Sequence, residues 1–102
     1  MSNRKNSRSL TPQELDRIAG RFKMLGEAMR LRILQVVCRE PRSVTDIVAT
    51  VGSTQANVSK HLALLATSGV LSRQRKGQRV YYALKDKLAM KLCELVHAEG
   101  IE

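Results

Sequence analysis

The sequence predicts a mainly α-helical fold with one β-hairpin, an α+β arrangement in the order α-α-α-α-β-β-α. Apolar residues recur at helical spacing in five segments, which predicts five helices. The third and fourth helices are separated by only about three residues, which is the spacing of a helix-turn-helix. A run of β-forming residues then surrounds Lys76-Gly77 and predicts a hairpin. A helix-turn-helix followed by such a hairpin is a winged helix-turn-helix.

Caps and breaks predict the bounds of the first two helices. Thr11 can cap a helix, Glu14 completes a capping box, and the helix fades near Gly26. A second helix is expected over residues 28 to 39 and ends before Pro41, because the residue before a proline avoids the α region. The apolar stripe of the first helix comprises Leu15, Ile18, Ala19 and Phe22, and that of the second comprises Leu31, Leu34, Val37 and Cys38.

The helix-turn-helix is predicted to begin at Ser43. This serine can cap the first of its helices, Gly52 closes that helix, and Thr54 opens the recognition helix. At about 100° per residue, the recognition helix has one inward and one outward face. The inward face comprises Val58, Leu62 and Leu65, and the outward face comprises Ala56, Asn57, Lys60, Ala63 and Thr67, with Leu64 as an apolar exception.

The hairpin and a last helix complete the fold. Residues 70 to 75 and 78 to 84 are expected to be strands, and residues 86 to 99 a helix. The apolar stripe of that helix comprises Leu88, Leu92, Leu95 and Val96. A short chain with 3% aromatic residues buries a limited core alone, which favours a dimer that covers more apolar surface.

Length and composition limit the class of protein. The 102 residues make one domain, expected over residues 11 to 102 and preceded by a disordered basic arm over residues 1 to 10. Hydrophobic residues at 43% exclude wholesale disorder, and no apolar run approaches the ~18 residues of a membrane span. Because the start also lacks the apolar core of a signal peptide, the chain is expected to be cytoplasmic, without membrane contact.

The strongest functional signal is a basic block that contains no acidic residue. The net charge is +9, and residues 47 to 85 hold no Asp or Glu. The cations of the block are Lys60, Arg73, Arg75, Lys76, Arg79 and Lys85. Because nothing in the block neutralises this charge, and because it holds a helix followed by a hairpin, it is suited to bind double-stranded DNA.

Candidate DNA contacts follow from where the block would meet the duplex. A helix start fits the major groove, where Gln55 and Asn57 can pair with adenine and Lys60 can reach guanine. Ser59 and His61 can serve bases or phosphates, and the helix N-terminus itself favours a phosphate. The candidates on the recognition helix are Thr54, Gln55, Ala56, Asn57, Ser59, Lys60 and His61. The wing candidates, for phosphates or the minor groove, are Arg73, Arg75, Lys76 and Arg79.

Other functions compete with a sequence-specific regulator. The same surface would serve a sequence-neutral nucleic-acid-binding or architectural protein, and winged helices are also reused as protein-interaction modules. An enzyme is not expected, since the chain has no paired carboxylates, no Cys-His-Asp set and no phosphate-cradling glycine loop. No cofactor is expected either.

Three stretches carry a resemblance to a known family. They are RLRIL in the second helix, Q-x-x-V-S-x-H-L in the recognition helix and G-x-x-V-Y-Y in the wing. Together they resemble the ArsR/SmtB family of bacterial winged-helix repressors, although Glu27-Ala28 replaces the Asp-Pro of many members. The resemblance implies a homodimer, paired through the first and last helices, that represses its target until an effector releases it. A two-fold dimer should read a pseudo-palindromic operator.

The metal-sensing positions of that family are not filled here. The arsenic and cadmium type has a cysteine pair in the helix before the recognition helix, where residues 44 to 49 hold no thiol. The zinc and nickel type has an Asp-x-His pair early in the last helix. Asp86 is kept, but Leu88 replaces the histidine, and Glu99 and Glu102 fall at the later positions. We therefore expect no metal site of either type.

The two cysteines are candidates for a thiol or effector site. Persulfide-sensing members pair a cysteine of the second helix with one at the end of the last helix. Cys38 lies about one turn later, and Cys93 about two turns earlier, than those positions. His97 follows Cys93 at i+4 and can lower its pKa or join it as a soft-metal ligand. The alternatives are a small core residue at Cys38 and an exposed or interfacial thiol at Cys93.

Overall fold

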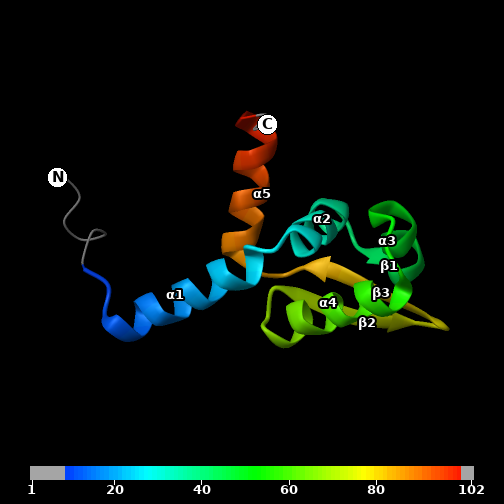
Figure 1. The fold of residues 1–102 in the computed structure, drawn as a ribbon, viewed down its shortest axis with the longest axis horizontal. Helices are drawn as coiled ribbons and strands as arrows, with labels where there is room; N and C mark the ends of the chain where they lie inside the picture. Colours follow the sequence, from blue (N-terminus) through cyan, green and yellow to red (C-terminus); the bar gives the residue numbers. More distant parts are fainter. Residues whose placement is uncertain (1–8, 100–102) are drawn as a thin grey trace.

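The computed structural model describes residues 9 to 99 as a winged helix-turn-helix. The elements are α1 (Pro12–Leu25), α2 (Ala28–Val37), β1 (Arg42–Ser43), α3 (Val44–Val51), α4 (Gln55–Thr67), β2 (Leu71–Lys76), β3 (Arg79–Leu84) and α5 (Lys87–Glu99). Helices α2, α3 and α4 and the sheet form the body of the domain (Figure 1). Helices α1 and α5 extend from one side of this body, at the end opposite the tip of the hairpin.

The sheet contains one strand that the sequence pattern does not predict. Its order is β1-β3-β2, with both pairs antiparallel. Strand β1 has two residues, and Ser43 pairs with Tyr81. A segment this short has no periodicity, so only its pairing with the wing defines it as a strand. The consequence is that the start of the helix-turn-helix is attached directly to the wing.

The hairpin strands lie close to their expected bounds. Residue 70 was expected in the first strand, but the carbonyl of Val70 instead accepts hydrogen bonds from the backbone N–H groups of Lys85 (2.9 Å) and Asp86 (3.2 Å). These bonds attach the end of the recognition helix to the start of α5. Gly77 turns the hairpin with a φ of 65°, a conformation that favours glycine.

The expected caps are present. Thr11 Oγ1 accepts from the Glu14 N–H at 3.1 Å, and Glu14 Oε1 accepts from the Thr11 N–H at 2.9 Å. Ser43 and Thr54 cap α3 and α4. Glu27, which departs from the Asp-Pro of many relatives, caps α2 by accepting the Arg30 N–H at 3.0 Å. The start of α2 is therefore capped in this chain without the Asp-Pro pair.

The core lies between α2, α3, α4 and the sheet. The inward face expected on the recognition helix is confirmed, because Val58, Leu62 and Leu65 are all buried. The expected face of α2 is partly wrong. Leu31 is 52% exposed, whereas Ile33 is fully buried, because the helices packed against α2 set the face it buries. Helix α2 also ends at Val37, two residues before the expected bound of residue 39.

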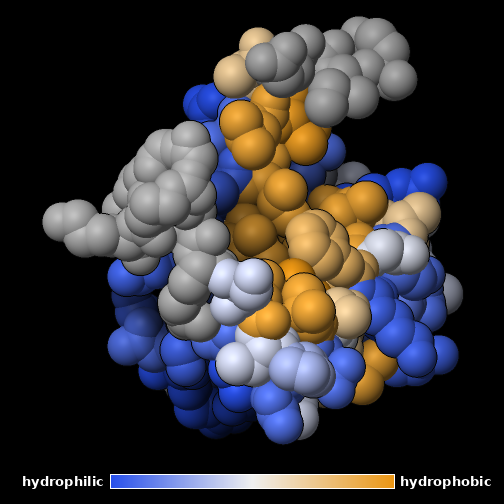
Figure 2. Space-filling view, turned by 90° about the vertical axis from the view of Figure 1, so that its left-hand side faces the viewer, coloured by the Kyte–Doolittle hydropathy of each residue, from blue (hydrophilic) through white to orange (hydrophobic). Residues whose placement is uncertain are grey.

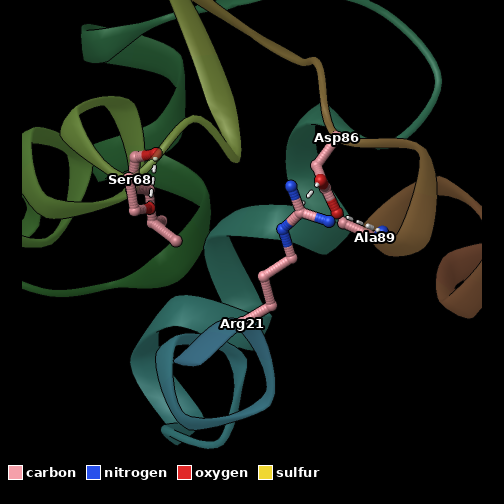
Figure 3. A network of polar contacts seen from close by, with 5 residues as sticks. Arg21, Ser68, Asp86 and Ala89 are labelled. Carbon is pink, nitrogen blue, oxygen red and sulfur yellow. Dashed lines mark hydrogen bonds and ion pairs between the residues drawn. The ribbon is translucent and has the colours of Figure 1, made fainter. Parts of the chain in front are cut away.

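Helices α1 and α5 contribute little to this core. Leu25 and Ala89 are buried, but much of the apolar surface of both helices faces outward. The exposed large apolar residues of the two helices are Leu15, Phe22, Met90, Leu95 and Val96. Figure 2 shows a continuous apolar band on this side of the molecule, beginning at α5 and flanked by hydrophilic surface. A polar contact between Arg21 and Asp86 joins the two helices (Figure 3).

Two parts of the sequence prediction lie outside the described residues. Residues 1 to 8 of the expected basic arm are not described, and neither is Glu102, which was considered as a position of the zinc and nickel type of site. Between residues 9 and 99, no helix has both the length and the apolar character needed to cross a membrane.

Candidate nucleic-acid interface

The start of α4 presents most of the expected reading residues to solvent. Thr54 Oγ1 accepts the Asn57 N–H at 3.1 Å, so that the helix begins with a capped turn. Gln55, Ser59 and Lys60 are exposed, and so is the small Ala56 between them. These side chains can reach a base edge or a phosphate without any change in the fold.

Asn57 differs from these neighbours because the turn holds it. Its Nδ2 donates to Ser53 Oγ at 3.1 Å, and the residue is half-buried. An asparagine needs its amide nitrogen and its oxygen together for a bidentate contact with adenine. The bond to Ser53 uses one of the two Nδ2 hydrogens and restricts the orientation of the Asn57 amide. Gln55, by contrast, is exposed at the start of the helix.

A polar groove of about 330 Å³ joins the recognition helix to the wing. Guanidinium, hydroxyl and amide groups line it together, a combination that binds phosphate oxygens. Its lining comprises Ser43, Val44, Thr45, Gln55, Ser59, Arg73, Gln78, Arg79, Val80 and Tyr82. Thr45 and Gln78 are additions that sequence reasoning missed. No sequence signal shows them, because the pairing of β1 with β3 brings the start of α3 beside the wing.

The cations of the wing lie on two different faces. Side chains alternate along a strand, and Arg73 pairs with Tyr82 while Arg75 pairs with Val80. Arg73 and Arg75 therefore share one face of the hairpin. Lys76 lies on the other face, where its Nζ is 5.6 Å from the centre of the Tyr81 ring. A cation at this distance from an aromatic ring is attracted to its face.

His61 does not lie on the DNA-reading face, contrary to expectation. It is only 7% exposed, and its Nδ1 accepts a hydrogen bond from Arg30 Nε at 3.2 Å. The sequence held the signal for this placement, because His61 follows Val58 by three residues and precedes Leu65 by four. Both of those residues are buried. His61 belongs to the inward side of the helix.

The two cysteines lie together between the end of α2 and α5. Both are free and half-buried, and Cys38 is the C-cap of α2. Burial, a hydrogen bond with the Cys38 thiol and the charge of Glu94 raise the pKa of Cys93 to about 12. The expected lowering of this pKa by His97 is therefore wrong. Although out of register with the family's sensing positions, the two thiols are neighbours.

A cavity of about 640 Å³ lies beside this thiol pair. Cys38 lines it together with His97 and Glu94 of α5, and apolar side chains from α2, β3 and α5 make up much of the rest. Within residues 9 to 99, no three His, Cys, Asp or Glu side chains are grouped so that they could hold a metal ion. Asp86 instead accepts the Ala89 N–H and pairs with Arg21.

These features define a winged helix-turn-helix DNA-binding domain. Residues 29 to 73 match the family model described as "Bacterial regulatory protein, arsR family". The chain belongs to the ArsR/SmtB family of winged helix-turn-helix transcriptional regulators.

Individual relatives agree with this assignment. A probable mercury resistance operon repressor of Streptomyces lividans is 34% identical over 71 residues, 70% of this chain and 57% of that one. The AntR antimony-specific transcriptional repressor matches with a TM-score of 0.81 and 30% identity over 96% of this chain and 90% of that one. A homodimeric winged helix-turn-helix DNA-binding domain of Mycobacterium bovis matches with a TM-score of 0.76 and 28% identity. The match covers 98% of this chain and 87% of that one. The chain spans little more than half the length of the first sequence relatives.

Proposed function

We propose that the protein is a homodimeric repressor that binds a pseudo-palindromic operator in double-stranded DNA and is released by a thiol-directed effector. The observation that carries DNA binding is the groove shared by the start of α4 and the wing. Gln55 and Ser59 border it on the helix side, and Arg73 and Arg79 border it on the wing side. A phosphate chain lying in this groove would place the start of α4 against the neighbouring base edges.

The exposed apolar surface of α1 and α5 supports the homodimer. Leu15 and Phe22 of α1 are 52% and 51% exposed, and Leu95 of α5 is 57% exposed. A two-fold partner on this surface would cover them and leave the wing outside, at the other end of the domain (Figures 1 and 2). Two recognition helices related in this way read half-sites about one DNA turn apart.

The adjacency of Cys38 and Cys93 supports a thiol-directed effector. Its chemical class is an oxidant or reactive sulfur species that links the two sulfurs, or a thiophilic metal ion that both sulfurs bind, with further ligands from the partner. Because the pKa of Cys93 is raised to about 12, this thiol is a weak nucleophile at neutral pH, so a first adduct would form on Cys38. Cys93 would have to lose its proton before it could displace that adduct and close a disulfide. Cytoplasmic reducing conditions would keep both thiols ready to react.

Binding to operator and scrambled duplexes at one salt concentration tests the DNA function. The operator is found by footprinting the promoter of the protein's own gene. We expect a preference of roughly 10³-fold or more for the operator. Gln55→Ala should reduce that preference, while Arg75→Ala should weaken binding to both duplexes alike. Equal wild-type affinity for the two duplexes would establish the sequence-neutral alternative instead.

Release from the operator tests the effector. Peroxide, polysulfide and thiophilic metal ions are added separately to the operator complex of the wild type and of Cys38→Ser and Cys93→Ser. Either substitution should abolish release by the active compound. Release that is unchanged in both variants would refute the role of the thiol pair without affecting the proposal of DNA binding.

A further inference from the structure

One arginine side chain joins three helices inside the domain. Arg30 lies in the first turn of α2, and its Nε donates to Nδ1 of His61 in the recognition helix at 3.2 Å. Its Nη1 donates to the backbone carbonyl of Met24, in the last turn of α1, at 3.2 Å. The same nitrogen lies 3.2 Å from the Met24 sulfur. Helix α1 is thus connected to α4 through one guanidinium group.

The chemistry of the contact determines which group donates. A guanidinium has only donors and stays charged, so the nitrogen of His61 that faces it must be an acceptor without a proton. Glu27 lies in the same turn, where its Oε1 accepts the backbone N–H of Arg30 at 3.0 Å. This hydrogen bond, together with the charge of the Arg30 side chain, holds the pKa of Glu27 below its ordinary value.

We propose that Arg30 and His61 are positioning residues that hold the recognition helix in a set orientation to α1. The inference rests on the proposed function, in which α1 helps to form the dimer and α4 reads the operator. The contact would then set how each reading face is presented relative to the two-fold axis. His61 is buried, so it acts on DNA through the placement of α4 and not through a contact of its own.

The forked guanidinium group of Arg30, with donors on separate nitrogens, is necessary for this role. Its two donors reach two different helices, whereas a lysine has one compact ammonium group on a flexible stem. Without the fork, α4 would occupy several orientations, of which only a fraction fits the operator. Apparent affinity falls in proportion to that fraction. Contacts of the wing with phosphates are less affected, because they do not depend on the angle of α4.

Four variants test the proposal. His61→Leu removes the acceptor and puts an apolar side chain in its place. His61→Asn keeps an acceptor, because its Oδ1 lies near the position of the histidine Nδ1. Arg30→Lys keeps the charge without the fork. Arg32→Lys, at an exposed position of the same helix, is the matched control. Each variant is assayed on operator and scrambled DNA, with circular dichroism and urea unfolding to verify that it is folded.

We expect His61→Leu and Arg30→Lys to weaken operator binding roughly tenfold or more, with a change of no more than about twofold on scrambled DNA. His61→Asn should restore most of the operator affinity, and Arg32→Lys should resemble the wild type. A general loss of stability would weaken binding to both duplexes and would not be rescued by asparagine.

The outcomes separate this proposal from the proposed function. A wild type without operator preference would overturn the proposed function and this inference with it. If the wild type prefers its operator and both His61→Leu and Arg30→Lys do so equally well, the positioning role alone is overturned. His61→Asn binding as poorly as His61→Leu would also overturn it. If His61→Leu does not fold, the comparison of Arg30→Lys with Arg32→Lys tests the positioning role. Equal operator affinity of these two variants would overturn it.

Discussion

Arg21 of α1 lies beside Asp86, the residue that precedes α5, with 3.5 Å between Nε and Oδ1 (Figure 3). The other carboxylate oxygen, Oδ2, accepts the backbone N–H of Ala89 at 2.9 Å. One side chain therefore caps α5 and contacts α1. This link matters because both helices extend from the body of the domain and bury few residues in its core.

Asp86→Ala should lower the free energy of unfolding by about 1–2 kcal/mol, mainly through the loss of the cap. Asp86→Asn should cost less, because an amide oxygen can still accept the N–H of Ala89. The ion pair itself adds little, since the Arg21 side chain is 51% exposed. Urea unfolding at one protein concentration measures the free energy of unfolding of the two Asp86 variants. Asp16→Ala, at an exposed site of α1, is the control and should change stability by less than about 0.5 kcal/mol.

Arg73→Ala and Lys76→Ala should differ in their effects on DNA binding, because the two cations lie on opposite faces of the wing. Arg73 lines the groove beside the recognition helix, whereas Lys76 stacks on Tyr81. Removing a phosphate contact lowers the salt slope of log K by about one. We expect this change for Arg73→Ala and a smaller one for Lys76→Ala. Equal slopes in titrations of a single duplex would mean that both faces contact DNA.

The raised pKa of Cys93 predicts a loss of stability at alkaline pH. The unfolded chain releases the thiol proton near the ordinary pKa of 9.0, whereas the folded protein keeps it up to about 12. Above pH 9 the folded state therefore binds more protons than the unfolded state, and the free energy of unfolding falls as pH rises. Urea unfolding across this range should show a steeper decline for the wild type than for Cys93→Ser. Parallel curves would contradict the burial of this thiol.

Leu95→Glu should dissociate the proposed dimer. Leu95 is 57% exposed on the apolar surface of α5, and a carboxylate there would be buried without a partner in any dimer that covers this surface. Sedimentation equilibrium should report a monomer for this variant. His97→Glu adds the same charge about 200° around the helix and should remain dimeric. A dimeric Leu95→Glu protein would place the interface elsewhere.

Local features of the fold could be predicted from the sequence because their causes are local. A capping box depends on residues three apart, so Thr11 and Glu14 define the start of α1 without help from the rest of the chain. The buried face of α4 follows from helical periodicity for the same reason. Strand β1 could not be predicted in this way, because its two residues become a strand only through their pairs on β3.

The candidate site also has some features that follow from local sequence and others that depend on tertiary packing. Gln55, Ser59 and Lys60 were expected on the exposed face of α4 and lie there. The outward position predicted for His61 is wrong, because its spacing from buried neighbours places it on the inward side of α4. The contact between Cys38 and Cys93 could not be predicted, since it depends on how α5 packs across the end of α2.

The sequence by itself determined the class of fold, the helix caps and the basic block that marks the DNA-binding surface. Each of these follows from residue type and short-range spacing. The tertiary structure alone decided which cations share a face, which thiols are neighbours and that His61 bonds to Arg30. These contacts join residues far apart in the chain, and their geometry is set by the packing of whole helices and strands, which no local pattern encodes.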